Sequence, residues 1–337
     1  MKILFTLDYE LFLGVRTGTV RKCLIEPMDA YLQATEEAGV RFTLFVDAAF
    51  LLRLKELAPS FPALEEEYRG IRDALCLLKE KGHDIQLHIH PQWMYSTFDG
   101  TGWRMDAGHY KLSDLGADEA SALFGRCREL LESVSGNPVI AYRAGGFSVP
   151  AGIAALFSPH GIKVDSSVCP GTCYFSGCQD YDYRNIDLRS AYRFDKDMSC
   201  PTGMGTYVEL PVYTYRTSPI FWYRYVISRL LKSKRHRLLG DGVSVEATTG
   251  SIIERLTRRT WGLATTDGFK INYLYDAYRY ACRTGEETFC VIGHPKLATP
   301  YSLKKLRDFC SRIAGDGNEF MTVSGFYTSL KGTGTIA

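Results

Sequence analysis

Two carboxylates and two imidazoles occur in this chain as pairs with the same two-residue spacing. Asp8 and Glu10 stand in Phe-Thr-Leu-Asp-Tyr-Glu, and His88 and His90 stand in Gln-Leu-His-Ile-His-Pro-Gln-Trp. Residues two apart in an extended strand point to the same side. Imidazole nitrogens beside a carboxylate form a ligand set for Zn²⁺ or a similar divalent ion, with an open position for water. The two pairs therefore predict metal-assisted or proton-transfer chemistry.

Each pair also has an ordinary structural explanation. Two acids can cap a helix or bond to a loop, and two histidines can be structural or solvent-facing. Two acids at the end of a buried strand, however, are costly without a cation or a proton to partner them. Because both pairs stand at the ends of predicted strands in one chain, we favour the metal-site interpretation.

Three more polar features follow predicted strands. Arg143 precedes Gly145 and Gly146 in Tyr-Arg-Ala-Gly-Gly-Phe. An arginine there can hold a carboxylate through two hydrogen bonds, and the glycines permit a tight turn and close approach of a ligand. Asp165, in Val-Asp-Ser-Ser, could orient a histidine or Arg143, and His294, in Gly-His-Pro, is well placed as a proton donor. A surface arginine before a turn and an Asx-turn aspartate are the plain alternatives.

The elements that must position these residues alternate between short apolar runs and segments of helical period. We predict strands at residues 2–7, 41–46, 84–89, 138–142, 161–165, 287–292 and 320–323, and helices at 27–38, 63–81, 117–134, 149–159, 270–283 and 302–314. This alternation is typical of an α/β protein with a parallel sheet or barrel. The catalytic candidates then gather at the carboxyl ends of the strands.

Residues 170–268 break this rhythm and are rich in tyrosine, glycine, serine and arginine. We interpret them as an insertion within a single domain of residues 1–337, because no proline-rich linker or repeat divides the chain. The run 219–237 is aromatic, apolar and cationic. It is either a solvated helix with a core-facing aromatic stripe or a segment that contacts a membrane surface or a pyrophosphate.

The composition limits the classes of partner and compartment. The chain has 337 residues, 45% of them hydrophobic, and a net charge of +2, which gives no support to nucleic-acid binding. The N-terminus becomes charged by residue 8, too early for the apolar core of an export signal, so we expect a cytoplasmic protein, with peripheral contact to the inner membrane face as an extension. No apolar run reaches the length of a membrane span.

Ten cysteines are scattered through the chain, and reduced thiols are the expected state. Cys169, Cys173 and Cys178 lie within ten residues, with Cys200 further on. They could form a second metal site or a redox pair, but their spacing matches no paired zinc-binding pattern.

The order of these motifs resembles the polysaccharide deacetylase (NodB-homology) family, from residue 3 to about residue 297. The Thr-Leu-Asp-Tyr-Glu and Gln-Leu-His-Ile-His-Pro-Gln-Trp segments are similar to a bacterial subgroup associated with surface-polysaccharide gene clusters. The resemblance implies a distorted (β/α) barrel with about seven parallel strands. It also implies a divalent metal, most often Zn²⁺ with Co²⁺, Ni²⁺ or Mn²⁺ as alternatives, and hydrolysis of an acyl group on a sugar.

Carried over residue by residue, the resemblance makes Asp8 the catalytic base, Arg143 the residue that holds it, His294 the general acid and Asp165 its tuning partner. Glu10, His88 and His90 become the metal ligands, and Gly145, Gly146 and Trp93 become substrate contacts. Two features depart from the family pattern. Tyr9 stands where a second aspartate is usual, so Asp8 and Glu10 could exchange roles, and the histidines are two rather than four residues apart.

The expected function is therefore metal-dependent removal of an N-acetyl or N-formyl group from a sugar, which could be nucleotide-linked or lipid-linked. Two other functions stay open. The chain could be a carbohydrate-binding protein that keeps the barrel without hydrolysis, or a hydrolase of a non-sugar amide or an O-ester.

Overall fold

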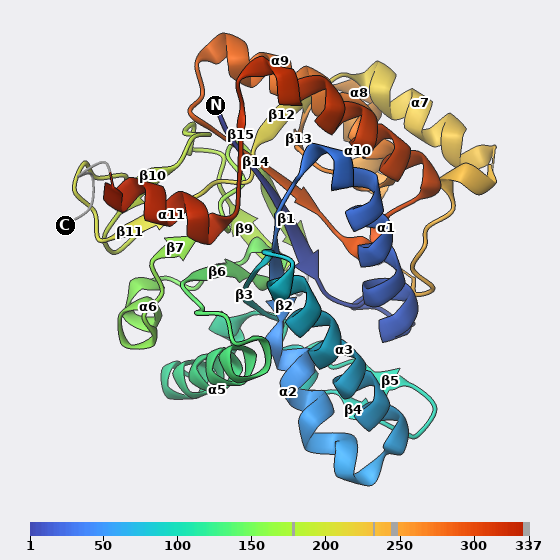
Figure 1. The fold of residues 1–337 in the computed structure, drawn as a ribbon, viewed down its shortest axis with the longest axis vertical. Helices are drawn as coiled ribbons and strands as arrows, with labels where there is room; N and C mark the ends of the chain where they lie inside the picture. The colour runs from blue at the N-terminus through green and yellow to red at the C-terminus, as the bar shows by residue number, and fades with distance from the viewer. Residues whose placement is uncertain (177–178, 232, 244–248, 333–337) are drawn as a thin grey trace.

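The computed structural model describes residues 1–176, 179–231, 233–243 and 249–332 (Figure 1). Its centre is a nine-stranded sheet in the order β10-β11-β7-β6-β3-β2-β1-β14, with β15 pairing to β1. The parallel strands are β1 (Lys2–Tyr9), β2 (Phe42–Asp47), β3 (Asp84–Ile89), β6 (Ala141–Ala144), β7 (Val164–Asp165), β11 (Tyr207–Glu209), β14 (Thr288–Gly293) and β15 (Glu319–Met321). Among the described strands of this sheet, only β10 (Tyr192–Phe194) pairs antiparallel.

Outside the paired strands, main-chain hydrogen bonds join the chain that follows β11 to β14. Tyr213 donates its N–H to the carbonyl of Cys290 at 2.9 Å, and Ala264 donates to the carbonyl of Tyr213 at 2.7 Å. Ile292 of β14 in turn donates to the carbonyl of Ala264 at 2.9 Å. The sheet therefore curls into a distorted barrel with seven parallel strands along its main path, which confirms the predicted fold class.

Helices cover the outside of the sheet, as strand-helix alternation requires. They are α1 (Glu26–Thr35), α2 (Ala48–Leu57), α3 (Pro62–Glu80), α4 (Gln92–Tyr95), α5 (Ala117–Ser135), α6 (Ala154–His160), α7 (Pro219–Leu230), α8 (Thr249–Thr257), α9 (Leu274–Thr284), α10 (Pro300–Ile313) and α11 (Val323–Gly332). In Figure 1, α2, α3 and α5 lie along one part of the sheet, whereas α7 and α8 lie together at the upper right.

Alternate residues of the central strands face the barrel interior, because successive side chains of a strand point to opposite faces. A separate buried cluster contains one residue from each of six strands, namely Leu4, Phe45, Ala141, Val164, Val208 and Cys290. Leu4, Thr6 and Asp8 share one face of β1, so the apolar cluster lies below a polar layer at the carboxyl end of the strand. This arrangement places the functional side chains on a packed core.

The predicted elements differ from the structure mainly at their ends. The strand predicted at 161–165 shrinks to the two residues of β7, because Gly161 ends α6 with a left-handed φ of 68° and Ile162 donates back to Phe157. The strand predicted at 138–142 becomes β6, shifted toward the C-terminus, because the Gln86 side chain accepts hydrogen bonds from the N–H groups of Ile140 and Ala141.

Three small two-stranded antiparallel sheets and β11 come from segments in which no strand was predicted. The small sheets pair β4 (Thr97–Phe98) with β5 (Trp103–Arg104), β8 (Cys173–Ser176) with β9 (Gln179–Asp182), and β12 (Thr214–Thr217) with β13 (Thr260–Leu263). Within residues 170–268, β11 pairs with β7 as a strand of the main sheet. No helix in the described part of the chain is long and apolar enough to cross a membrane.

Candidate metal centre

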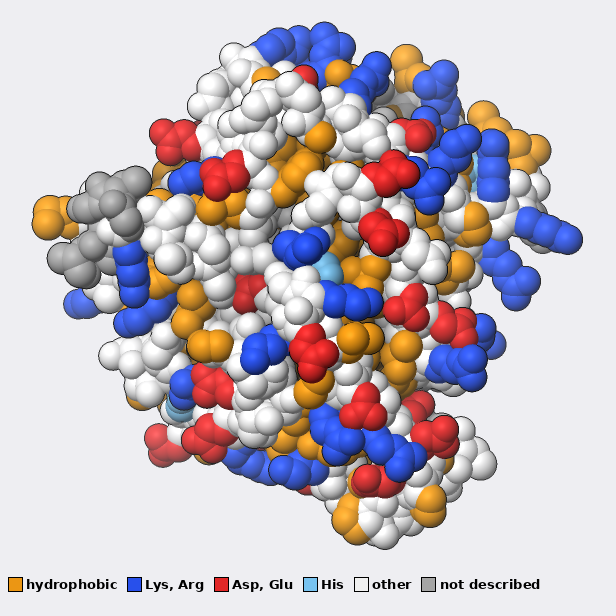
Figure 2. Space-filling view, viewed as in Figure 1, with side chains coloured by type: hydrophobic (Ala, Val, Ile, Leu, Met, Phe, Trp, Pro, Cys, Tyr) orange, Lys and Arg blue, Asp and Glu red, His pale blue; other side chains and the backbone are white. Residues whose placement is uncertain are grey.

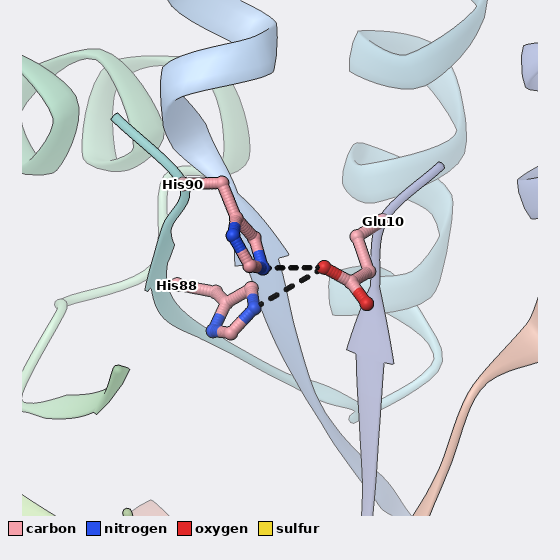
Figure 3. A group of neighbouring side chains, drawn as sticks. All are labelled: Glu10, His88 and His90. Carbon is pink, nitrogen blue, oxygen red and sulfur yellow. Dashed lines mark ion pairs between the residues drawn. The ribbon is translucent and has the colours of Figure 1, made fainter. Parts of the chain in front are cut away.

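Glu10, His88 and His90 converge at the carboxyl ends of β1 and β3 (Figure 3). Glu10 Oε2 lies 2.8 Å from His90 Nε2 and 3.4 Å from His88 Nε2. One ligand atom from each residue falls within 4.8 Å of the others, and all three residues are buried. Among the described residues this is the single group of three or more such side chains with that spacing.

The hydrogen bonds of His88 indicate what the group is built to hold. His88 Nδ1 lies 2.8 Å from the carbonyl oxygen of Arg143, which can only accept, so Nδ1 carries the proton. In the neutral ring, Nε2 then presents a lone pair toward the Glu10 carboxylate, and it has no hydrogen-bond partner among the described residues. Two acceptors facing each other in a buried site need a cation or a proton between them. The three residues therefore fit a divalent metal.

Lys296 holds the other oxygen of Glu10. Its buried ammonium donates to Glu10 Oε1 at 2.9 Å and to the carbonyl of Leu11 at 2.6 Å. Burial alone would raise the pKa of Glu10, but Lys296, His90 and His88 together hold it well below its ordinary value. Glu10 is therefore ionised, with Oε1 engaged by Lys296 and Oε2 directed at the histidines.

The same charges act on His88. Burial opposes the charged imidazolium, but Glu10 and then Asp8 raise the pKa of His88 to about 9. A field that attracts a proton to this nitrogen also attracts a divalent cation, which supports the fit of a metal to the group.

Asp8 is held by Arg143, as the arginine motif predicts. Arg143 Nη1 donates to Asp8 Oδ1 at 2.6 Å, and Nη2 donates to Thr6 and Ser166 hydroxyl oxygens at 2.9 Å each. The guanidinium also lies 4.2 Å from the centre of the Phe45 ring and is completely buried. Its position is thus fixed by at least four neighbours, and it fixes Asp8 in turn.

His294 faces both acids from the end of β14. Its Nε2 lies 3.7 Å from Asp8 Oδ2 and 3.7 Å from Glu10 Oε1. On the other side of the ring, Nδ1 donates to Asp267 Oδ2 at 3.0 Å, and the His294 main-chain N–H donates to Asp267 Oδ1 at 2.9 Å. Burial lowers the pKa of His294, but Asp267, Asp8 and Glu10 outweigh that effect and raise it.

Asp165 was predicted to tune His294, and this prediction is wrong. The Asp165 carboxylate accepts from the N–H and the hydroxyl of Ser167, both at 3.0 Å, and it lies beside Glu209 in the β7–β11 pair. Asp267 occupies the predicted place beside His294. Asp165 and Ser167 instead hold the main chain beside the cavity, because the Ser167 hydroxyl accepts a hydrogen bond from the N–H of Ala144, which lines it.

The predicted substrate contacts separate into two groups. Gly146 lines a cavity of about 170 Å³. The same cavity is lined by the five residues predicted to bind metal or to act at the reaction centre other than Arg143 and Asp165, namely Asp8, Glu10, His88, His90 and His294, and by Tyr110, Ala144 and Phe147. Gly145 lies behind the cavity, because a Cβ there would come within 2.5 Å of the carbonyl oxygen of Ile89 and 2.8 Å of the His90 ring. Glycine is therefore required at 145 by the close approach of the Ile89 carbonyl and the His90 ring.

Trp93 does not line the cavity, so its assignment as a substrate contact is corrected. It is fully buried, donates its indole N–H to Asp47 Oδ2 at 2.7 Å and packs on Phe50 and Trp103. Asp47 also accepts from the main-chain N–H of His90 at 3.2 Å. Trp93 therefore helps to position His90 through Asp47 and does not contact a ligand in the cavity.

Asp267 and Lys296 are the functional neighbours that the sequence motifs missed. Lys296 follows the Gly-His-Pro motif by one residue, so a buried cation beside two acids could have been suspected. Asp267, in Thr-Thr-Asp-Gly, has the composition of an ordinary turn, and its partner His294 is 27 residues away.

The cysteine cluster gains no support as a second site. Cys169 is buried, Cys173 and Cys200 are exposed, and Cys178 lies outside the described residues. The described cysteines are not joined in disulfides.

Comparison of the sequence with protein-family models and with curated proteins finds no match. Solved structures do match. A Mycobacterium smegmatis protein assigned as a polysaccharide deacetylase is 16% identical with a TM-score of 0.57, over 100% of this chain and 91% of that one. A Pseudomonas aeruginosa protein with the same assignment and PuuE allantoinase are each 11% identical with TM-scores of 0.52, over 100% of this chain and 92% of theirs.

These likenesses confirm the predicted resemblance at the level of the fold, which is that of the polysaccharide deacetylases. At identities of 11–16% they carry the architecture alone.

Proposed function

We propose that this protein is a metal-dependent hydrolase that removes an N-acetyl or N-formyl group from a sugar. The observation that carries the proposal is the convergence of Glu10, His88 and His90 with two further pairs, Asp8–Arg143 and His294–Asp267, around one cavity. This set contains a ligand group, a base and an acid, each held by a second residue.

In this proposal Glu10, His88 and His90 hold a divalent metal, with Zn²⁺ the first candidate and Co²⁺, Ni²⁺ or Mn²⁺ as alternatives. When bound, the metal supplies Lewis-acid polarisation of the acyl carbonyl and a lowered pKa for water. The hydrogen bond from His88 Nδ1 to the Arg143 carbonyl keeps Nε2 free as a ligand atom, and Lys296 leaves Glu10 Oε2 free.

Asp8 is the proposed base. Arg143 occupies its Oδ1, so Oδ2 is the oxygen that faces the cavity side and His294. A carboxylate fixed in this way accepts the proton of the attacking water. The contacts of Glu10 with both histidines favour Glu10 over Asp8 as the ligand, which addresses the exchange of roles that the sequence left open.

His294 is the proposed acid for the leaving amine. Because Asp267 engages Nδ1, the proton available to a substrate is the one on Nε2, which lies on the side of Asp8 and Glu10. Donation from Nε2 would release the amino sugar, and acetate or formate would be the second product.

The size of the cavity favours a small acyl group. A volume of about 170 Å³ is below the roughly 300–1,000 Å³ of pockets that enclose whole small ligands. An acetyl or formyl group fits, and the sugar then lies at the mouth, beside Tyr110 and Phe147. Aromatic rings there suit the apolar face of a pyranose.

The cellular context extends this proposal. We place the reaction in bacterial surface-polysaccharide or other glycan metabolism in the cytoplasm, with a nucleotide-linked or lipid-linked sugar as substrate. The structural likeness to an allantoinase keeps one alternative, hydrolysis of a non-sugar amide, and an O-ester is a related variant. A binding protein without hydrolysis is the third, but it would not need the Asp8–Arg143 and His294–Asp267 pairs.

Metal content and product release test the proposal together. We expect about one divalent ion per wild-type chain by elemental analysis, and loss of it in His88→Ala/His90→Ala. A panel of N-acetylated, N-formylated and O-acetylated sugars, with allantoin as the non-sugar amide, is then assayed for acetate, formate or ring opening. Metal binding without turnover of any sugar amide would overturn the proposed substrate class, and absence of specific metal after reconstitution would overturn the mechanism.

A further inference from the structure

Helix α7 carries an apolar stripe on its solvent side. Five of its positions and the residue after it form this stripe. Together with two residues of α8 we call it the α7–α8 ridge: Ile220, Tyr223, Val226, Ile227, Leu230, Leu231, Ile252 and Ile253. Their exposed fractions range from 36% to 74%. Positions three, four and seven apart share one face of a helix, so the α7 members form a continuous strip.

The ridge is not needed to pack α7 onto the protein. The opposite face of α7 contains Trp222, which is 5% exposed and donates its indole N–H to Thr217 Oγ1 at 3.0 Å. Phe221, on the same side, packs against Phe269 and Tyr273 at ring distances of 5.7 and 5.0 Å. The helix thus has an anchored aromatic face and a second apolar face directed away from the protein.

The residues around the ridge are cationic. Residues 219–237 contain Arg224, Arg229, Lys232, Lys234, Arg235 and Arg237 and no acidic residue, although the whole chain has a net charge of only +2. Arg224 and Arg229 are exposed on α7 itself. In α8 and the two residues that follow it, Glu254 is outnumbered by Arg255, Arg258 and Arg259. Figure 2 shows orange side chains beside blue ones over the α7–α8 region at the upper right.

Apolar side chains on one helix face with lysine and arginine at its borders are the composition of helices that lie in a membrane interface. An exposed aliphatic strip is unfavourable in water, whereas basic residues near a membrane gain from the negative potential of anionic lipids. A protein partner would need acidic residues around an apolar surface that fits the ridge, whereas an anionic bilayer provides both an apolar interior and negative charge. Charge complementarity therefore favours a lipid surface.

We propose that the α7–α8 ridge docks the protein on an anionic membrane surface as a peripheral contact. The aliphatic side chains enter the interface, and Arg224 and Arg229 contact lipid phosphates. The docking helix is joined to the site, because Phe221 contacts Phe269, which lies two residues after Asp267. This proposal stands independently of the catalytic one, since it concerns binding alone.

Flotation with lipid vesicles tests the docking. Wild-type protein is mixed with vesicles of phosphatidylcholine alone or of equal parts phosphatidylcholine and phosphatidylglycerol. We expect binding to the anionic vesicles and its decrease as salt is added. Ile227→Ser/Leu230→Ser should lower the partition coefficient at least tenfold, and Arg224→Gln/Arg229→Gln should remove most of the preference for anionic lipid.

Val15→Ser/Leu77→Ser is the matched control, because both side chains are exposed elsewhere on the molecule. It should bind as wild type does, and circular dichroism checks that every variant is folded. Failure of wild-type protein to bind anionic vesicles would overturn the proposal, as would unchanged binding by Ile227→Ser/Leu230→Ser. Sedimentation of the same proteins tests whether a second copy of the chain occupies the ridge instead. If wild-type protein is a dimer that does not bind vesicles, and Ile227→Ser/Leu230→Ser is a monomer, the ridge is a dimer interface and the membrane proposal is wrong.

Discussion

Asp267 accepts two hydrogen bonds from a single residue, His294. Oδ1 accepts from the main-chain N–H at 2.9 Å, and Oδ2 accepts from ring Nδ1 at 3.0 Å. The pair fixes both the rotation of the imidazole and the nitrogen that carries its outer proton. His294 lowers the pKa of Asp267 in turn, against the opposing effect of burial.

Asp267→Asn should therefore impair turnover without removing metal. The amide cannot accept both hydrogen bonds as an anion does, so we expect kcat to fall by about 10–100-fold, as is typical for residues that orient a functional imidazole. The basic limb of the pH–rate profile should also move to lower pH, because Asp267 stabilises the charged His294 ring. Steady-state kinetics at a series of pH values measures kcat and the position of the basic limb, and elemental analysis checks that Asp267→Asn retains its metal. An unchanged profile in a variant with reduced kcat would contradict the orienting role.

Asp8→Asn and Glu10→Gln should separate the base from the ligand. Each change keeps the side-chain shape and removes one charge. We expect Asp8→Asn to retain its metal and to lose at least about 10²-fold in kcat, the usual contribution of a general base. Glu10→Gln should lose metal affinity, because the oxygen between the two histidines no longer carries a charge. The reverse pattern, with metal lost only in Asp8→Asn, would show that the two acids have exchanged roles.

Lys296→Met should destabilise the metal-free protein by about 3–5 kcal/mol, because it leaves the buried Glu10 carboxylate without its cation. Metal binding supplies a replacement positive charge, so the rise in Tm on adding metal should be larger in Lys296→Met than in wild type. Thermal unfolding with and without metal measures both effects, and Lys305→Met, at an exposed position on α10, is the control. An equal loss of stability in the two states would indicate that Lys296 acts only through packing.

The part of the site that could be predicted consists of residues at the ends of strands. Asp8, His88 and His294 follow apolar runs whose parallel arrangement brings their ends together, so spacing and alternation were sufficient to place them. The barrel was predictable for the same reason, because strand and helix periods alternate in order along most of the chain.

The remainder depended on tertiary contacts that leave no local pattern. Asp267 lies in a turn-like sequence and acquires its role only when residues 264–266 pair with β14. Strand β11 has only three residues and lies within the aromatic segment that breaks the rhythm of the sequence. Trp93 stands next to the histidine motif, but its indole N–H finds a buried partner in Asp47, and this hydrogen bond turns it into the core.

Glu209→Gln should change how stability depends on pH. Glu209 and Asp165 are fully buried neighbours in the β7–β11 pair. Burial and then Asp165 raise the pKa of Glu209 well above its ordinary value, and burial raises that of Asp165 to about 6. The folded state therefore binds more protons than the unfolded state between the ordinary carboxyl range and these raised values, so stability falls as pH rises through that window.

In Glu209→Gln, the glutamine side chain keeps an oxygen for the Val168 N–H, which in wild type donates to Glu209 Oε1 at 3.0 Å. The substitution removes the titrating group. As pH rises above the ordinary carboxyl range, Glu209→Gln should gain stability relative to wild type, with a gain in Tm of roughly 2–4 °C per kcal/mol. Scanning calorimetry as a function of pH, with the exposed Glu80→Gln as control, measures this gain. Parallel curves of stability against pH for wild type and Glu209→Gln would show that titration of Glu209 does not contribute to the pH dependence.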